Sequence, residues 1–145
     1  MRQALSLSLR ALLRFRAGTG DNTEIVGQGV NRAAKKYPRS AVFAVAGSAV
    51  LASGETLTLK NVSVEHDSAS NFATTADLKT FADAVVATGP SGGGTVHFCK
   101  EYEADLSGAK QYVRLMATPD LSRTGTDTFN LSGVGVLGGQ DVLPA

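Results

Sequence analysis

The segment ETLTLKNVSVEHD, residues 55–67, decides the fold class of this chain. Its core-facing side chains would recur at every second position, first as Leu57 and Leu59 and then, in shifted phase, as Val62, Val64 and His66. An alternation of period two predicts a half-buried β-strand, because successive side chains of a strand point to opposite faces. One inserted residue at Lys60–Asn61 would produce the change of phase, so we predict a β-bulge there.

Several other segments alternate in the same way, and turn-forming residues separate them. We predict strands over residues 40–45, 95–105, 110–118 and 127–137, a short extended piece over 24–30, and a helical turn over 32–36 that ends before Pro38. Residues 78–86 fit either a short helix or another extended segment. Turns are expected at 18–22, 46–48, 67–71, 89–94 and 119–120. Short strands without helices between them predict an all-β protein, an antiparallel β-sandwich that is jelly-roll-like.

One domain accounts for the length and composition of the chain. It has 145 residues, of which 43% are hydrophobic and 19% charged, which suits a single core and is too apolar for a disordered tail. No stretch of about 18 uninterrupted apolar residues occurs, so we expect no membrane partner. Cys99 is the only cysteine, which excludes an internal disulfide and a cysteine-built zinc site and favours a reducing, cytosolic origin.

Residues 1–16 are predicted to form an N-terminal arm ahead of one β-sandwich domain over residues 17–145. As a strand, the arm would carry Leu5, Leu7, Leu9, Ala11, Leu13 and Phe15 on one face, opposite Ser6, Ser8, Arg10, Leu12, Arg14 and Arg16. Only Leu12 breaks this alternation, and we therefore favour an extended strand. As a helix, the leucines would share one face, in the manner of a transit peptide or a surface-lying helix, and this alternative stays open.

Charge is unevenly placed along the chain. Residues 1–40 have eight basic and two acidic side chains, a net charge of +6, whereas residues 41–145 have six basic and eleven acidic ones, a net charge of −5. A basic leading segment on an acidic body suits docking on a neighbouring subunit or an acidic assembly surface. The predicted assembly contacts are Arg10, Arg14, Arg16, Lys35, Lys36 and Arg39. Nucleic acid is the rival partner, but no aromatic residues interleave the basic ones to stack on bases, so we expect no specific nucleic acid.

Two glycine-rich segments resemble phosphate-binding motifs. Residues 133–138, GVGVLG, match the dinucleotide fingerprint GxGxxG, which needs a following helix whose amide groups hold a pyrophosphate. Only seven residues follow Gly138, so we interpret these glycines as letting a strand bend or pack closely. The three glycines at 92–94 lack the Lys-Ser/Thr pair of a phosphate loop and predict an ordinary loop.

Four side chains in the segment 95–105 have the types that a metal or catalytic site needs. His97, Cys99, Glu101 and Glu103 would share one strand face. Neighbours on such a face lie about 7 Å apart, so four of them cannot converge on one ion. We expect these side chains, including the pair of carboxylates, to face solvent or another subunit.

Two further groups carry the residue types of an active site. His66, Asp67 and Ser68 are adjacent, and a strand turns neighbours to opposite faces, which prevents the relay of a catalytic triad. The loop between Asp120 and Asp127 resembles a calcium-binding loop, but it lacks a dense spacing of carboxylates. We therefore predict no catalytic residue, no metal and no cofactor, and we expect that the protein is not an enzyme.

The residue composition and alternation of several stretches together resemble those of small virion proteins of tailed phages and prophages. The segments that carry the likeness are residues 18–27, 40–65, 102–110, 118–122 and 134–139, with their Gly, Ala, Ser and Val alternation. The likeness covers most of residues 17–145, whereas residues 1–16 and Lys35–Lys36 are less typical. It implies a capsid decoration (cement) protein with a jelly-roll core.

The resemblance implies partners and a location. The chain would bridge neighbouring subunits of the major capsid protein and associate with itself as a dimer or trimer. It would lie on the capsid surface of the virion after assembly in the host cytoplasm. The alternatives are a carbohydrate-binding or receptor-binding jelly-roll module of a tail or fibre, and a head–tail joining or tail-tube subunit. Sugar-binding modules expose aromatic rings, and this chain has three tyrosines and no tryptophan.

Overall fold

The computed structural model of the chain describes residues 15–18, 21–123 and 125–139. Within these residues the chain forms strands and one short 3-10 helix, η1 (Ala33–Lys35). The strands are β1 (Phe15–Gly18), β2 (Ile25–Val26), β3 (Val30–Asn31), β4 (Ser40–Leu51), β5 (Thr56–Asp67), β6 (Ala76–Thr80), β7 (Ala84–Thr88), β8 (Gly94–Asp105), β9 (Tyr112–Leu121) and β10 (Thr128–Gly138).

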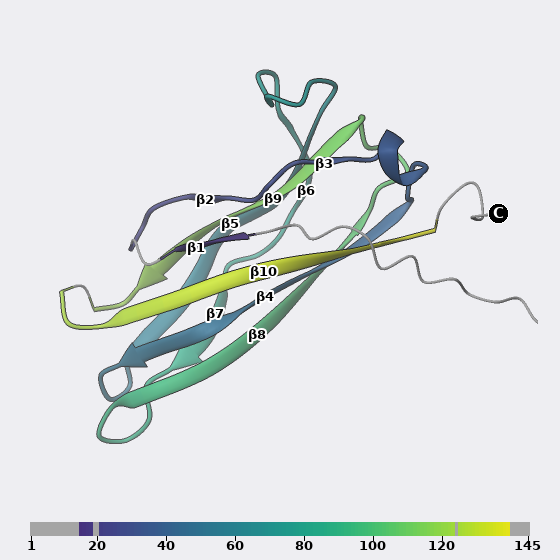
Figure 1. The fold of residues 1–145 in the computed structure, drawn as a ribbon. Coiled ribbons are helices and arrows are strands. Elements are labelled where there is room, and N and C mark those ends of the chain that lie inside the picture. The colour runs from purple at the N-terminus through teal and green to yellow at the C-terminus, as the bar shows by residue number, and fades with distance from the viewer. Residues whose placement is uncertain (1–14, 19–20, 124, 140–145) are drawn as a thin grey trace, which may run out of the picture.

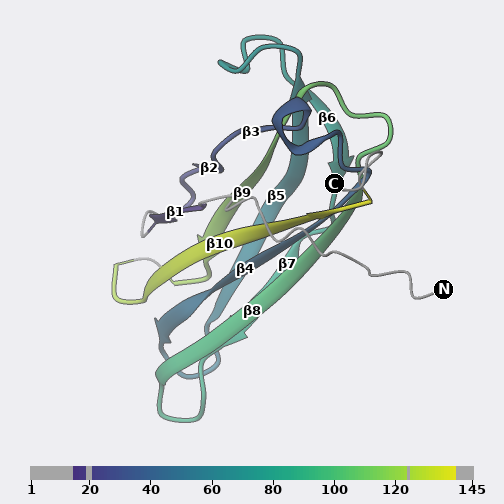
Figure 2. The ribbon, with the colours of Figure 1, turned by 45° about the vertical axis from the view of Figure 1, so that its right-hand side comes forward.

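The strands form two antiparallel sheets that lie one behind the other (Figure 1, Figure 2). In sheet A the order of the described strands is β1-β10-β4-β8. In sheet B, β9 and β5 are central. The strands β2 and β3 follow one another along the free side of β9, and β6 and β7 do the same along β5. The predicted all-β class and antiparallel β-sandwich are therefore confirmed.

The core lies between the two sheets and is filled by alternate side chains of the long strands. The largest fully buried side chains are Phe43, Leu51, Leu57, Leu59, Leu106, Leu115 and Leu131. Burying one such side chain stabilises the fold by about 1.5–3 kcal/mol. Because side chains of a strand alternate between its faces, each long strand also turns every second residue away from this core.

The β-bulge predicted in β5 is confirmed. Lys60 pairs with Thr118 and Ser63 with Met116, so β5 has one residue more than β9 between these two pairs. Asn61 lies in the bulge with a φ of +48°. This is the left-handed region, which asparagine adopts more readily than most other non-glycine residues. The extra residue explains the change of phase in the sequence pattern.

The bulge also divides the strand that pairs with β5. The core-facing residues on its two sides are all buried: Leu57, Leu59, Val62 and Val64. One side pairs with β7 and the other with β6. Between them, the backbone N–H of Asn61 donates to Oδ1 of Asp83 (3.2 Å), in the turn that joins β6 to β7. Residues 78–86, for which helix and strand were both open, therefore belong to two short strands and the turn between them.

The strand β4 is longer than the sequence pattern indicates. The turn predicted at residues 46–48 is wrong, because β4 continues to Leu51 and pairs with β10 and β8 on its two sides. Gly47 lies opposite Leu131, and a Cβ on Gly47 would lie only 2.0 Å from the carbonyl oxygen of Asn130. The glycine thus marks a close approach of two strands, and hydrogen bonding on both sides overrides its local preference for a turn.

The turn predicted at residues 119–120 is also wrong, because β9 passes through Pro119 and ends at Leu121. The carbonyl oxygen of Pro119 accepts a hydrogen bond from the backbone N–H of Asn22 (2.8 Å), on the side away from β5. The N–H and C=O of one strand residue point to the same side. The N–H that proline lacks is therefore not needed for pairing with β5, and the strand tolerates the residue.

The helical turn predicted over residues 32–36 is confirmed as η1, and a buried arginine anchors it. Arg32 is 4% exposed, and its guanidinium donates to the carbonyl oxygens of Ala109, of Lys110 (3.0 Å) and of Pro38 (2.9 Å). After η1, Lys36 has a left-handed conformation that ends the turn. The arginine therefore ties the β3–β4 connection to the loop between β8 and β9.

The strand β1 crosses the predicted boundary between the arm and the domain. Phe15 pairs with Gly133 and Gly18 with Leu131, so these residues extend sheet A beside β10. The extended strand that we favour for residues 1–16 otherwise falls on residues 1–14, which lie outside the described residues.

We predict that Asn61→Val lowers the free energy of unfolding by about 1–2 kcal/mol, because a β-branched residue is strained at positive φ. Asn61→Gly should leave it nearly unchanged, since glycine adopts this conformation freely. Chemical denaturation measures both. Asn130→Val, on an exposed position of β10, is the matched control and should change stability little. Equal losses at positions 61 and 130 would contradict the role of the bulge.

Candidate functional site

Sheet A turns one side to the core and the other to the surface, and the outward side is built from small side chains. On β4 and β10 the outward residues are Val42, Ala44, Ala46, Ser48, Val50, Thr128, Asn130, Ser132, Val134 and Val136. None of these side chains is larger than valine or asparagine, so the surface is flat. We call this surface, together with the outward residues of β8, the sheet A face.

The register arranges the sheet A face in rows across β10, β4 and β8. The central rows are Val136–Val42–Glu103, Val134–Ala44–Glu101, Ser132–Ala46–Cys99 and Asn130–Ser48–His97. One end of the face is therefore apolar and the other polar, and carboxylates line its β8 margin at the apolar end. Figure 1 shows β10, β4 and β8 side by side in front of sheet B.

The polar end of the face contains a shallow depression of about 400 Å³. Its lining residues are Ala46, Gly47, Ser48, His97, Asn130 and Ser132. These groups offer hydroxyl, amide and imidazole hydrogen-bonding atoms to a partner, together with one alanine methyl group. The depression adds a polar subsite to a face that is otherwise suited to close packing.

Contacts from sheet B hold the β8 margin in place. Lys79 on β6 donates from Nζ to the carbonyl oxygen of Glu103 (2.6 Å), and the same ammonium lies 5.0 Å from the ring centroid of Phe81. On the inward side of β8, Tyr102 packs edge-on against Phe81, with ring centroids 4.9 Å apart. The hydroxyl of Tyr102 is buried without a hydrogen-bond partner among the described residues, and burial raises the pKa of Tyr102 to about 12.

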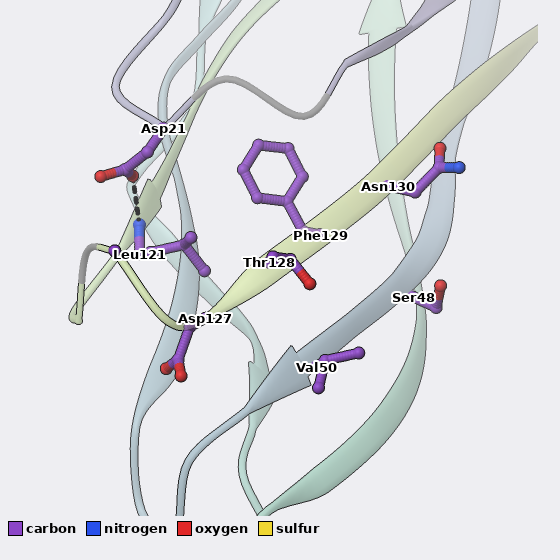
Figure 3. Close-up of a pocket in the computed structure, with 9 residues that line it drawn as sticks. Asp21, Ser48, Val50, Leu121, Asp127, Thr128, Phe129 and Asn130 are labelled. Carbon is purple, nitrogen blue, oxygen red and sulfur yellow. Dashed lines mark hydrogen bonds between the residues drawn. The ribbon is translucent and has the colours of Figure 1, made fainter.

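A second hollow, of about 560 Å³, lies where the loop between β9 and β10 meets the end of β4 (Figure 3). Oδ1 of Asp21 accepts a hydrogen bond from the backbone N–H of Leu121 (2.7 Å), and Oδ1 of Asp127 accepts one from Ala52 (3.1 Å). In Figure 3 the two carboxylates do not point toward one another. Each therefore anchors a loop, and the pair does not form a joint binding site.

The structure separates the two aspartates of the calcium-like loop. Asp120 forms an ion pair with Lys60, with 2.7 Å between Nζ and Oδ2, and this hydrogen bond raises the pKa of Lys60. Asp127 faces the turn between β4 and β5 instead. Among the described residues, no three His, Cys, Asp or Glu side chains lie close enough to hold a metal ion.

The other chemically active side chains that the sequence brings to attention stay apart. The four residues of β8 all lie exposed along its outward side: His97, Cys99, Glu101 and Glu103. Asp67 is buried and accepts hydrogen bonds from the backbone N–H groups of Ala69 (3.1 Å) and Thr74 (2.8 Å), which lower its pKa. Nδ1 of His66 accepts one from Lys110 (3.2 Å). Asp67 and His66 thus support loops.

Four of the six predicted assembly contacts lie among the described residues. Lys35 and Lys36 lie at the end of η1, and Arg39 is exposed just before β4, with its backbone N–H bonded to the carbonyl oxygen of Gly138 (3.0 Å). Arg16 belongs to β1. Arg10 and Arg14 lie outside the described residues. The role of all six in assembly stays a prediction.

Sequence reasoning missed the sheet A face itself. Its signal is in residues 41–50, AVFAVAGSAV, where every even-numbered position is valine, alanine or serine. We interpreted residues 46–48 as a turn, which broke this row of small side chains in two. The sequence predicted that the carboxylates on β8 face solvent or another subunit, but not that they border a wider face formed with β4 and β10.

No protein family model and no curated protein sequence matches this chain. In the part of the chain that the structure describes, no helix has the length and apolar character needed to cross a membrane. The geometry of the sheet A face and the residue pattern of the sequence are therefore the basis for a function.

We predict that Tyr102→Phe leaves the free energy of unfolding at pH 7 unchanged or raises it by up to about 1 kcal/mol, because it removes an unpaired buried hydroxyl. In the unfolded chain the pKa is near 10, against about 12 in the fold. Because the unfolded chain releases this proton first, the protein with Tyr102 loses stability as the pH rises from about 10 through 12, whereas below pH 10 the group adds no pH dependence. Unfolding curves of both proteins across this range should diverge, and parallel pH profiles would contradict the burial of this group.

Proposed function

We propose that this protein is a structural subunit of a tailed-phage or prophage virion, a capsid decoration protein that bridges neighbouring subunits of the major capsid protein. The sheet A face carries this proposal. Its small side chains form a flat surface with an apolar end, a polar depression and an acidic margin, which suits a protein that works through contact area. The resemblance of residues 17–145 to small virion proteins supports the same function.

The sheet A face supplies most of the area of a stable protein contact. Three strands about 4.8 Å apart and about 11 residues long, at about 3.3 Å per residue, cover roughly 14 Å by 36 Å, or about 500 Å². A standard interface buries about 800 Å² per partner, so side chains around the margin of the face would supply the remainder. On β4 and β10, side chains no larger than valine or asparagine let the backbone of a partner come close. Repetition around a shell would multiply the effect of each contact.

We also propose that the sandwich is a jelly roll. The strand order supports this finer classification when β2 with β3, and β6 with β7, are each counted as one broken strand. The eight strands obtained in this way are numbered in chain order. The strand order is then 1-8-3-6 in sheet A and 2-7-4-5 in sheet B. This order is the one expected of two Greek keys of antiparallel strands, which supports the jelly-roll proposal.

The alternative of a sugar-binding module has less support from the tyrosines. Tyr37 is 48% exposed, Tyr102 is buried, and Tyr112 packs against Phe72 with ring centroids 6.4 Å apart. A sugar-stacking platform needs several exposed rings near one another. A head–tail or tail-tube subunit would have the same β-rich character but close into a ring, and copy number separates these alternatives from decoration.

We predict that phage particles whose genome encodes this chain contain it in a copy number comparable with that of the major capsid protein. Quantitative mass spectrometry gives this ratio, and electron microscopy of the same particles gives the location. A decoration protein repeats around the whole shell, because every group of shell subunits offers the same docking site. Six or twelve copies at one vertex would replace the proposal by a ring subunit, and absence from particles would overturn it.

A second prediction concerns the face directly. Ala44→Arg should weaken co-sedimentation with capsids at least tenfold, because a long charged side chain would rise from the centre of a flat surface. Val85→Arg, on an exposed position of β7 in sheet B, is the matched control. It adds the same charge and should leave binding unchanged. Equal effects of the two substitutions would assign the docking surface to another part of the molecule.

A further inference from the structure

The strand β8 is a long edge of sheet A. It has 12 residues, whereas the described parts of the other edge strands have two to five: β1, β2, β3, β6 and β7. Short or interrupted edge strands offer little backbone for pairing with another chain. A long edge strand presents a row of N–H and C=O groups that another strand can extend.

One hydrogen bond shows which groups of β8 face outward. The carbonyl oxygen of Glu103 accepts from Nζ of Lys79, a residue of sheet B, on the side of β8 away from β4. Because N–H and C=O of alternate strand residues point to the same side, the backbone of Thr95, His97, Cys99 and Glu101 faces that free side too. All four residues are exposed. This edge is therefore open to an added strand over residues 95–101, and at Glu103 an added strand would share the carbonyl oxygen with Lys79.

The side chains along the edge favour a basic partner. Glu101, Glu103 and Asp105 follow one another on the outward side of β8, and all three are exposed. Lys100, also exposed, is the basic residue within the same stretch of strand. The stretch thus combines free backbone groups with a net negative charge, the combination expected of a site for a basic extended segment.

The N-terminal arm has the pattern of such a segment. Residues 5–14 alternate between apolar and polar side chains, and Arg10 and Arg14 share the polar face four residues apart. Glu101 and Asp105 are also four residues apart on one face. The equal spacing allows two salt bridges between the arm and β8 in either strand direction. A parallel arm would pair Arg10 with Glu101 and Arg14 with Asp105. An antiparallel arm would pair Arg10 with Asp105 and Arg14 with Glu101.

The arm that pairs in this way must come from a second copy of the chain. Phe15 lies on β1, at the opposite edge of sheet A, three strand spacings or about 14 Å from β8. Residue 14 lies about 3.8 Å from Phe15 along the chain. An arm whose Arg14 reaches β8 therefore cannot start from the β1 of the same molecule.

We propose that the free edge of β8 accepts residues 5–14 of a second copy as an added strand, antiparallel like every strand pair of sheet A, with Arg10 paired to Asp105 and Arg14 to Glu101. The donor arm leaves one edge of sheet A and the acceptor strand forms the other. The contact is therefore head-to-tail, and it forms a ring where the rotation between copies closes and an open chain of copies where it does not. This inference identifies how copies associate and does not depend on the capsid assignment.

Charge exchange tests the proposal. The full chain should be oligomeric in sedimentation velocity at about 100 µM, well above the micromolar dissociation constants common for such contacts. Glu101→Arg with Asp105→Arg, or Arg10→Glu with Arg14→Glu, should weaken association roughly ten- to a hundredfold through like-charge repulsion. All four substitutions together should restore it. Glu24→Arg with Asp77→Arg, two exposed carboxylates away from β8, is the control of equal charge and should change nothing.

A proline separates strand addition from charge attraction alone. Leu12→Pro keeps every charge but removes an arm N–H that would bond to β8, so it should also weaken association at least tenfold. Gln3→Pro, outside the paired segment, should not. A monomeric full chain, failure of the fourfold charge exchange to restore association, or an unaffected Leu12→Pro variant would each overturn the proposal. Loss of capsid binding with self-association intact would instead contradict the decoration function and leave this inference standing.

Discussion

The pairing of β4 along its whole length is the interaction on which the rest of this structure depends. Each of its 12 residues has a partner on β8, and all but the last have one on β10. This double ladder aligns three long strands in one register, which gives both the buried inner layer and the flat outer face. Gly47 permits it, because no side chain there could avoid the backbone of β10.

Sheet B contributes the asymmetry of the molecule. The bulge at Asn61 breaks the partner of β5 into β6 and β7, so that edge of the sandwich offers only short strands. Their turn supplies Phe81, which packs on Tyr102, and β6 supplies Lys79, which reaches the backbone of Glu103. These contacts support β8 along its edge. The edge proposed for self-association is thus supported by local contacts from the opposite sheet.

Much of the fold could be predicted from period-two alternation, because the pattern is a direct consequence of strand geometry. The bulge was predictable for the same reason, since one extra residue shifts the phase. The two wrong turns share a cause. Gly47 and Pro119 have strong local preferences, but each sits where neighbouring strands accommodate it, Gly47 by close approach and Pro119 by turning its missing N–H away from β5. The anchoring role of Arg32 left no pattern, because its three acceptors are backbone carbonyls that any residue provides.

The sequence by itself determined the all-β class, the bulge in β5, the outward placement of His97, Cys99, Glu101 and Glu103, and the alternating basic character of residues 5–14. These are properties of single strands, which local order along the chain defines. Only the tertiary structure decided which strands are neighbours, which rows of side chains form one face, and which strand is left as a free edge. These properties arise from pairing between segments far apart in the chain, where hydrogen bonding and burial outweigh local preference.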